Sequence, residues 1–369
     1  MRKYIIKSML SLALVASIFS CTDDEVGNSP ITFISIYDPV NYQELDTLMI
    51  GQLIQIVGDN FMSISKISIN NVDVPIGTNA TITKESIYLS VPRIPKMEKN
   101  SIVLHTLSQN TIEKTIEVKF PPFKFLGMEN EFTQPGDELV ILGESLDLYL
   151  TPGDSKIMIG QKEASVEAVT EYEAIVRVPL DVENNSIVKL VSPELGEVLC
   201  PGRFRDTFFV IENLEDKSKT RYPAFVVPNT DFPAPLSPLP IEGNNYSRIV
   251  KNTSGLLNMV GNYNLTIPDN LLDEGEMYDL KFEMCTIEPL AFRFAVSLNQ
   301  GTTNYMIGPS TATSNPDQQL STSGKWKTFS VPLSYWKGKS GTKNLRAFVT
   351  LPVGVKYDLC LDNFRIQPK

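Results

Sequence analysis

Histidine and cysteine are too scarce in this chain of 369 residues to support most catalytic centres. The one histidine, His105, lies in an alternating run typical of a strand, and Ser-His-Asp, Cys-His and common zinc chemistry would all depend on it. Cys21 aside, Cys200, Cys285 and Cys360 form no disulfide framework, although a pair between Cys285 and Cys360 is open. The enzyme class that remains to be weighed is hydrolysis by paired carboxylates.

Binding chemistry is better represented, because aromatic residues gather in the last part of the chain. Both tryptophans and seven of the 13 tyrosines lie after residue 205. Residues 211–369 carry 16 Lys+Arg and 15 Asp+Glu, so the net charge of -10 falls on the earlier part. A near-neutral, aromatic-rich surface favours neutral sugars, whose C–H faces stack on rings while their hydroxyls form hydrogen bonds.

Four aromatic residues are the candidate ligand contacts. Tyr335 and Trp336 follow the strand end at Pro332 and precede a loop of Lys, Gly and Ser, so we expect an exposed pair at a strand-to-loop edge. Tyr305 and Tyr263 lie in segments rich in Gly and Asn and are secondary candidates. The alternative for these two is a tyrosine at a sandwich edge with a satisfied hydroxyl.

Composition restricts the other classes. An apolar content of 42% with 21% charged residues predicts folded domains, and no segment after residue 21 is apolar enough to span a bilayer. The negative charge argues against nucleic acid as a partner, because nucleic acid requires a basic face.

The N-terminus predicts export. Arg2, Lys3 and Lys7 precede an apolar run, Met9–Phe19, which has the length of a signal-peptide core. The segment ending at Cys21 resembles a bacterial lipobox, which implies lipidation of Cys21 and attachment to the outer membrane; the alternative is an ordinary signal peptide. The segment Thr22-Asp23-Asp24-Glu25 follows at once, and its acidic cluster resembles the surface-export signal of Bacteroidetes-type lipoproteins. The alternative is a merely solvated tether.

The elements that must position these residues are short strands. Runs such as 53–57, 67–69, 176–178 and 278–284 alternate or are β-branched, and turn residues bound them. We expect further strands at 208–211 and 290–298 and no amphipathic helix after residue 21. The fold class predicted is all-β, built from sandwiches.

An internal repeat defines two of the sandwiches. Gly51–Gly58 and Gly136–Gly143 each hold a strand between glycines, and the copies end in Val91-Pro92 and Val178-Pro179. We expect these glycines to occupy tight turns that require positive φ. The repeat resembles the IPT/TIG immunoglobulin-like family, in which such domains act as spacers, and it covers residues 31–120 and 121–205.

The C-terminal unit, residues 206–369, resembles the carbohydrate-binding jelly rolls in two strands, Gly324–Leu333 and Leu361–Ile366. The resemblance implies that Trp326 is a core residue. It also implies that Asp362 could hold a structural calcium ion, although no companion acidic cluster is evident and no cofactor is otherwise expected.

Together these features resemble the surface glycan-binding lipoproteins of Bacteroidetes polysaccharide-utilisation systems, of the type whose last domain binds xyloglucan. The predicted domains are a signal peptide at 1–20, an acidic tether at 21–30, two spacers and a carbohydrate-binding sandwich at 206–369. The predicted function is non-catalytic, cell-surface binding of xyloglucan or another β-glucan or hemicellulose. The resemblance implies a TonB-dependent transporter and a starch-utilisation-type binding lipoprotein as partners. An adhesin and a glycoside hydrolase are the alternatives.

Overall fold

The computed structural model describes residues 30–94, 100–151, 153–228, 239–251, 255–262, 267–298, 303–339, 344–351 and 355–369. These residues form many strands and a few helices of three to five residues, so the predicted all-β fold is confirmed. Within them, no helix is long and apolar enough to cross a membrane. Cys21 and the acidic residues after it lie outside the described part of the chain.

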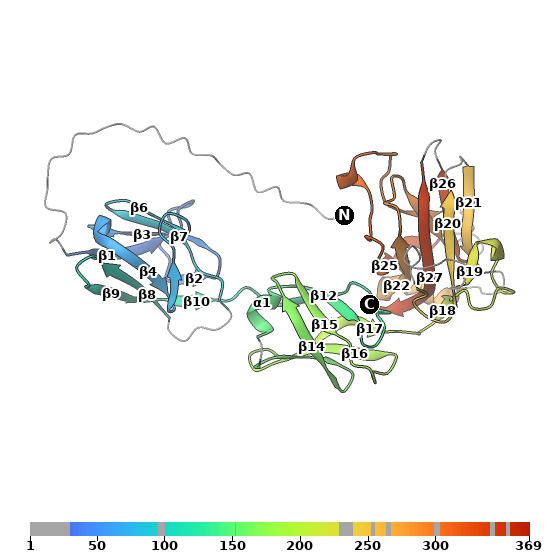
Figure 1. The fold of residues 1–369 in the computed structure, drawn as a ribbon, viewed down its shortest axis with the longest axis horizontal. Helices are drawn as coiled ribbons and strands as arrows, with labels where there is room; N and C mark the ends of the chain where they lie inside the picture. Colours follow the sequence, from blue (N-terminus) through green and yellow to red (C-terminus); the bar gives the residue numbers. More distant parts are fainter. Residues whose placement is uncertain are drawn as a thin grey trace. The chain divides into compact units, whose positions relative to one another are not determined.

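The chain divides into two compact units, residues 1–120 and 121–369 (Figure 1). The first unit packs a sheet of order β1-β3-β7-β6 against a sheet of order β5-β4-β8-β9, with a two-stranded ribbon of β10 and β2. Alternate residues of β3, β4 and β8 fill one core. The elements are β1 (Thr32–Tyr37), β2 (Thr47–Met49), β3 (Leu53–Asp59), η1 (Phe61–Ser63), β4 (Ile64–Ile69), β5 (Val72–Val74), β6 (Ala80–Ile82), β7 (Ser86–Ser90), β8 (Ser101–Thr106), β9 (Thr111–Thr115) and β10 (Glu117–Lys119).

The second unit begins with a sandwich made from one seven-stranded sheet of order β11-β12-β15-β14-β13-β16-β17. Strand β14 pairs with β15 through one part and with β13 through another, and a register shift between Val166 and Ala168 lies on the β15 side. The elements are β11 (Lys124–Met128), β12 (Glu138–Glu144), α1 (Leu146–Tyr149), β13 (Lys156–Ile159), β14 (Lys162–Val169), β15 (Glu173–Arg177), β16 (Ser186–Ser192) and β17 (Gly196–Phe204).

The C-terminal sandwich has two sheets, which Figure 1 shows as a stack of long strands. The larger sheet has the order β19-β20-β27-β22-β25, with β18 also on β27, and the smaller has the order β21-β26-β23-β24. The elements are β18 (Val210–Glu212), η2 (Pro223–Phe225), β19 (Val226–Pro228), β20 (Asn245–Lys251), β21 (Gly255–Gly261), α2 (Asp269–Asp273), η4 (Gly275–Met277), β22 (Tyr278–Thr286), β23 (Phe294–Ser297), β24 (Asn304–Ile307), η5 (Pro316–Gln318), β25 (Lys327–Pro332), η6 (Leu333–Trp336), β26 (Arg346–Leu351) and β27 (Tyr357–Pro368).

The sequence repeat corresponds to a repeated set of backbone hydrogen bonds. In the first sandwich, the N–H of Gly51 donates to the carbonyl of Val91 at 2.9 Å. In the second, the N–H of Gly136 donates to the carbonyl of Val178, also at 2.9 Å. Gly51 and Gly136 have φ of 77° and 90°, which confirms the turn predicted there.

The second glycine of each copy has a different role from the predicted one. Gly58 and Gly143 do not have a positive φ. A neighbouring strand passes so close to each of them that there is no room for a side chain. A Cβ on Gly58 would lie 1.9 Å from the carbonyl oxygen of Thr32, and a Cβ on Gly143 would lie 2.7 Å from that of Lys124. The expectation of a positive-φ turn is therefore wrong for this pair.

One predicted strand is shorter than expected. Of residues 290–298, only Phe294–Ser297 form β23. Leu290 instead makes an isolated bridge with Leu320, and the chain bends before it enters the sheet. The apolar run extends beyond the strand because Leu290 and Leu298 are buried at its ends.

We predict that Gly58→Ala destabilises the first sandwich by about 1–3 kcal/mol or more, because the new methyl group overlaps backbone. Gly51→Ala, where the added Cβ meets open space, should cost only about 1 kcal/mol of backbone strain. Hydrogen exchange of β3 peptides in urea measures both changes. Equal losses in the two variants would contradict the distinction between packing and φ.

Candidate functional site

Three of the four predicted aromatic contacts lie together at one edge of the C-terminal sandwich. The ring of Tyr335 lies 5.1 Å from that of Tyr305 and 5.3 Å from that of Trp336, measured between centroids. The short helix η6 carries Tyr335 and Trp336, and edge strand β24 carries Tyr305. Tyr263 lies outside the described residues.

The predicted exposure of Trp336 is wrong. Its side chain is 2% exposed and belongs to the main core of the sandwich, where the indole N–H donates to the carbonyl of Thr303 at 3.0 Å. A 3₁₀-helix advances about a third of a turn per residue, so it separates the directions of adjacent side chains. Tyr335 therefore remains 40% exposed while Trp336 points inward.

The three rings also do not form the flat face that a simple stacking platform would need. Tyr335 meets Tyr305 at 85° and Trp336 at 84°, which is edge-to-face packing. The hydroxyl of Tyr335 donates to the carbonyl of Asn304 at 2.9 Å, which holds the ring against the edge of the sheet. Tyr335 thus offers one ring to a ligand, and Tyr305 and Trp336 support it. Whether Trp336 touches a ligand stays a prediction, which its burial disfavours.

The core position expected for Trp326 is not what the structure shows. Trp326 is partly exposed, its indole N–H donates to the carbonyl of Leu239 at 2.8 Å, and its ring meets Tyr246 edge-on. Trp326 directly precedes β25, in which Phe329 and Val331 face the main core and side chains alternate. When the alternation is continued one residue beyond the strand, position 326 falls on the opposite face, a signal that the sequence contained.

A second surface, not identified from the sequence, lies beside Tyr335. It is the face of the smaller sheet of the C-terminal sandwich, β21-β26-β23-β24, that points away from the core, and it is here called the front face. Cross-strand pairing aligns Arg346, Ser297 and Asn304 in one row, and Asn258, Phe348, Ala295 and Met306 in the next. Leu256 extends the face toward one end of the sheet, and it is 52% exposed.

The front face combines a largely buried aromatic ring, Phe348, with oriented polar groups. The guanidinium of Arg346 lies 4.7 Å from the centroid of the Phe348 ring and donates to the amide oxygen of Asn258. The small side chains of Ala295 and Ser297 lie between this group and Met306, which is 42% exposed. The amide oxygens of Asn304 and Asn344 are buried without a hydrogen-bond partner among the described residues. This is the residue chemistry that sugar hydroxyls require.

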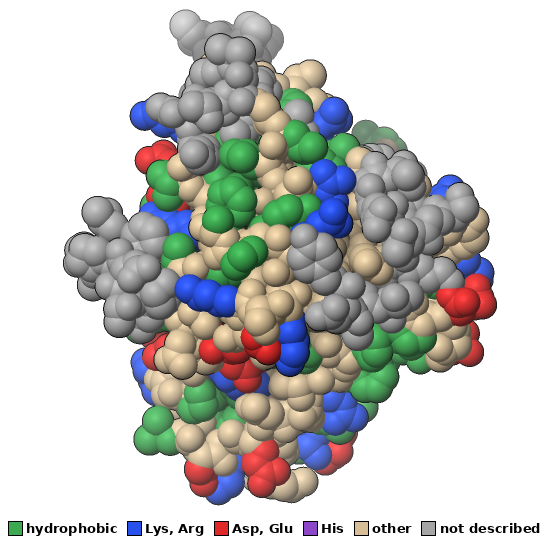
Figure 2. Space-filling model, turned by 90° about the vertical axis from the view of Figure 1, so that its right-hand side faces the viewer, with side chains coloured by type: hydrophobic (Ala, Val, Ile, Leu, Met, Phe, Trp, Pro, Cys, Tyr) green, Lys and Arg blue, Asp and Glu red, His purple; other side chains and the backbone are tan. Residues whose placement is uncertain are grey.

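Figure 2 shows one side of the molecule in which hydrophobic side chains lie among uncharged polar ones over the upper part. Basic side chains border them, and acidic ones gather mainly lower in the view. The mixture of apolar and uncharged polar groups is compatible with a neutral, hydroxyl-rich ligand.

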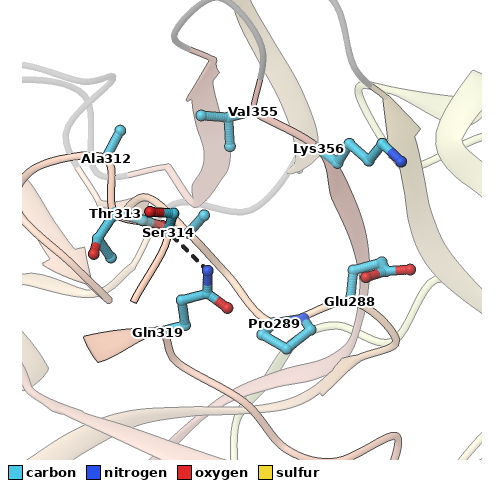
Figure 3. Close-up of a pocket in the computed structure, with 9 residues that line it drawn as sticks. Glu288, Pro289, Ala312, Thr313, Ser314, Gln319, Val355 and Lys356 are labelled. Carbon is cyan, nitrogen blue, oxygen red and sulfur yellow. Dashed lines mark hydrogen bonds between the residues drawn. The ribbon is translucent and has the colours of Figure 1, made fainter. Parts of the chain in front are cut away.

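A separate pocket of about 410 Å³ lies among the loops of the C-terminal sandwich (Figure 3). Thr313 and Gln319 lie on one side, joined by a 3.1 Å hydrogen bond from the Gln319 amide to the Thr313 carbonyl, and Glu288 and Lys356 lie on the other. The lining contains no aromatic ring, so the pocket offers no stacking surface. It consists of Glu288, Pro289, Ala291, Ala312, Thr313, Ser314, Gln319, Val355 and Lys356.

The C-terminal sandwich was compared with models of known protein families. Residues 222–368 match the family model described as "Surface glycan-binding protein B xyloglucan binding domain". The match covers most of the C-terminal sandwich. The predicted resemblance to the surface glycan-binding proteins of Bacteroidetes is confirmed by this match.

Two solved structures are similar to this chain, and the first supports the fold. The surface glycan-binding protein PbSGBP-B from Prevotella bryantii is 17% identical, with a TM-score of 0.53, and the match covers 92% of this chain and 99% of that one. SGBP-B from a complex xyloglucan utilization locus in Bacteroides uniformis is 15% identical, with a TM-score of 0.49 and coverage of 92% and 100%. No curated protein matched the chain.

Asp362 of the xyloglucan-binding-type domain lies in surroundings that disfavour the predicted calcium ion. Its side chain is fully buried, and burial raises the pKa of the carboxyl well above its usual range. Calcium binds the ionised form. Among the described residues, no group of three His, Cys, Asp or Glu side chains is placed to hold a metal ion. A calcium site at Asp362 stays an untested prediction.

The cysteine pair left open by the sequence lies in the same sheet. Cys285 and Cys360 are directly opposite each other in β22 and β27, and both are buried free thiols in the structure. Burial raises the pKa of the Cys285 thiol to about 11, which disfavours the reactive thiolate.

We predict that Asp362→Asn becomes more stable than the wild type as the pH rises. Because the native pKa is raised, the folded protein retains a proton that the unfolded chain releases above about pH 3.9, so wild-type stability falls as the pH rises through the native pKa. Urea midpoints between pH 4 and pH 8 measure the difference.

The matched control for this variant is Asp181→Asn. Asp181 is exposed, and its hydrogen bond with Lys162 lowers the pKa of its carboxyl, so this variant should gain no stability with pH. A variant of Asp362 that is less stable than the wild type at pH 8 would show that the buried carboxyl is ionised there.

Proposed function

We propose that the chain is a non-catalytic, cell-surface protein that holds a β-glucan or related hemicellulose, with xyloglucan as the first choice of ligand. The observation that carries the proposal is the position of the exposed Tyr335 ring beside the front face, in a sandwich that matches the model of a glycan-binding family. Tyr335 supplies a stacking surface, and Asn258 and Arg346 supply hydrogen-bonding groups that are already held in place.

The distribution of carboxylates supports a binder over a glycoside hydrolase. Hydrolysis requires two carboxyl groups on either side of the scissile bond. The front-face residues named above include no Asp or Glu. Three buried carboxyls in the larger sheet have a raised pKa, those of Glu212, Glu283 and Asp362. Glu283 and Asp362 have no exposed surface and Glu212 is 5% exposed, so none of them is presented openly to a polysaccharide.

The remaining features extend the proposal to the cell surface. A lipid on Cys21 would attach the chain to the outer membrane, and the acidic residues after it would direct the chain outward. A polysaccharide bound there is too large to enter the cell, so a TonB-dependent transporter and a starch-utilisation-type binding lipoprotein are the proposed partners. An adhesin with the same sandwiches remains the alternative function, because it also needs an exposed surface.

The first test measures binding of residues 22–369 to soluble plant and microbial polysaccharides by calorimetry. We expect Tyr335→Ala to weaken the affinity about 2- to 13-fold, since an aromatic contact contributes about 0.5–1.5 kcal/mol beyond buried area. Tyr172→Ala, which removes an exposed tyrosine from the second sandwich, is the control and should bind as the wild type does. Release of reducing ends would instead indicate an enzyme, and absence of binding across the panel would refute the proposal.

A second test distinguishes the contribution of the front face to binding from that of Tyr335 at the edge of the sheet. Arg346→Met keeps an apolar side chain beside Phe348 but removes the guanidinium donors. We expect a loss of affinity of about 10- to 150-fold, because hydrogen bonds of charged groups contribute about 1.5–3 kcal/mol. The melting temperature should change little. Unchanged affinity in this variant, with a loss in Tyr335→Ala, would restrict the site to the edge of the sheet.

A further inference from the structure

The larger sheet of the C-terminal sandwich buries charge on the side that faces away from its core. In β27, Leu361, Phe364 and Ile366 face the core. Arg365 points to the other side, yet its side chain has no exposed surface, and neither has that of Glu283 from β22. Antiparallel sandwich sheets commonly leave this side to water. A fully buried ion pair here needs something that covers it.

The second sandwich provides the cover and part of the charge. The guanidinium of Arg365 donates to both carboxylate oxygens of Glu283, at 2.7 and 2.9 Å, and to Glu131 of the second sandwich at 2.8 Å. Lys281 of β22 forms an ion pair with the same Glu131 carboxylate, which is 5% exposed. Two cations and two anions are thus balanced, and one of the anions comes from the other sandwich.

Thr328 of β25 joins the same cluster. Its hydroxyl accepts from the backbone N–H of Glu131 at 2.8 Å and donates to Glu283 at 3.0 Å. The backbone N–H of Thr328 donates to the carbonyl of Glu129 at 2.8 Å, which satisfies the exposed edge of β25. Backbone of the second sandwich therefore continues the hydrogen bonding of the larger sheet.

Phe132 closes the cluster from the second sandwich. Its ring centroid lies 4.6 Å from the guanidinium of Arg365 and 5.3 Å from that of Arg205. Phe132 is 1% exposed. Further along the sheet, the amide of Gln367 donates to the carbonyl of Asp206 at 3.0 Å. The contact is buried and charged, and its hydrogen-bonded partners have a specific geometry.

We propose that Glu131, Phe132, Lys281, Glu283 and Arg365, here called the Glu131 cluster, join the second and C-terminal sandwiches into one cooperative folding unit with a fixed mutual orientation. Removal of Glu131 would leave Arg365 and Lys281 to share Glu283 in a buried setting, which is strongly unfavourable. The second sandwich is then a structural part of the glycan-binding unit and not an independent spacer. The proposal holds whichever ligand the front face binds.

The test follows local unfolding of residues 22–369 in urea by hydrogen exchange and mass spectrometry. Peptides from β12 and β16 report on the second sandwich, and peptides from β22 and β27 report on the C-terminal one. In the wild type, we expect both sets to unfold at one urea concentration. Glu131→Gln should raise the opening constant of both sets on the order of a hundredfold.

The matched control is Glu138→Gln, which breaks the exposed ion pair with Arg177 on the same sandwich. We expect a change in the opening constant of less than about fivefold for this surface pair. If Glu131→Gln does not fold, Phe132→Leu replaces it; this variant keeps every ion pair, removes the ring over the two guanidinium groups and should shift both midpoints together by a smaller amount.

Two results would overturn the proposal. One is unfolding of the two sandwiches at separate urea concentrations in the wild type. The other is a shift in Glu131→Gln, or in Phe132→Leu, no larger than that of Glu138→Gln. Either result would show that the sandwiches are independent domains that merely touch.

Discussion

A fully buried guanidinium must have its charge compensated, and in this chain the compensation for Arg365 comes from two sandwiches. Glu283 reaches it from the neighbouring strand and Glu131 from a domain more than 200 residues earlier in the chain. Burial raises the pKa of Glu283, while Arg365 opposes that rise, so the two charges are stable only together. The packing of the larger sheet depends on this arrangement.

The constraint divides the C-terminal sandwich into two sides with different uses. The outer side of the larger sheet is occupied by charge pairs and by the second sandwich. The front face of the smaller sheet carries Phe348, Arg346 and Asn258 in a preorganised arrangement. Phe348 is only 5% exposed, whereas Leu256 and Met306 on the same face are open to solvent. A long, neutral polysaccharide suits the exposed Tyr335 ring with fixed polar groups beside it better than a closed pocket.

The packing of Tyr305, Tyr335 and Trp336 limits how much ring surface is available to a ligand. Tyr305, Tyr335 and Trp336 lie close enough to contact one another, and edge-to-face contacts stabilise the group. The same geometry removes the broad flat surface that three coplanar rings would offer. Trp336 contributes to the core and fixes the position of η6, which in turn orients the one exposed ring.

The sequence by itself determined the all-β class, the repeat of the first two sandwiches and the aromatic-rich, near-neutral composition of the last. These features are local: alternation sets strands, Gly51 and Gly136 require turns, and aromatic composition follows chain position. The exposure of Trp336, the close crossing at Gly58 and the front face could not be derived in the same way. They depend on which strands become neighbours in the sheets. For Trp336, the direction in which η6 leaves the end of β25 also decides which side chain faces the core. The sharing of Glu131 between two sandwiches was decided by tertiary structure alone, because a buried charge finds its partner in space and not along the chain.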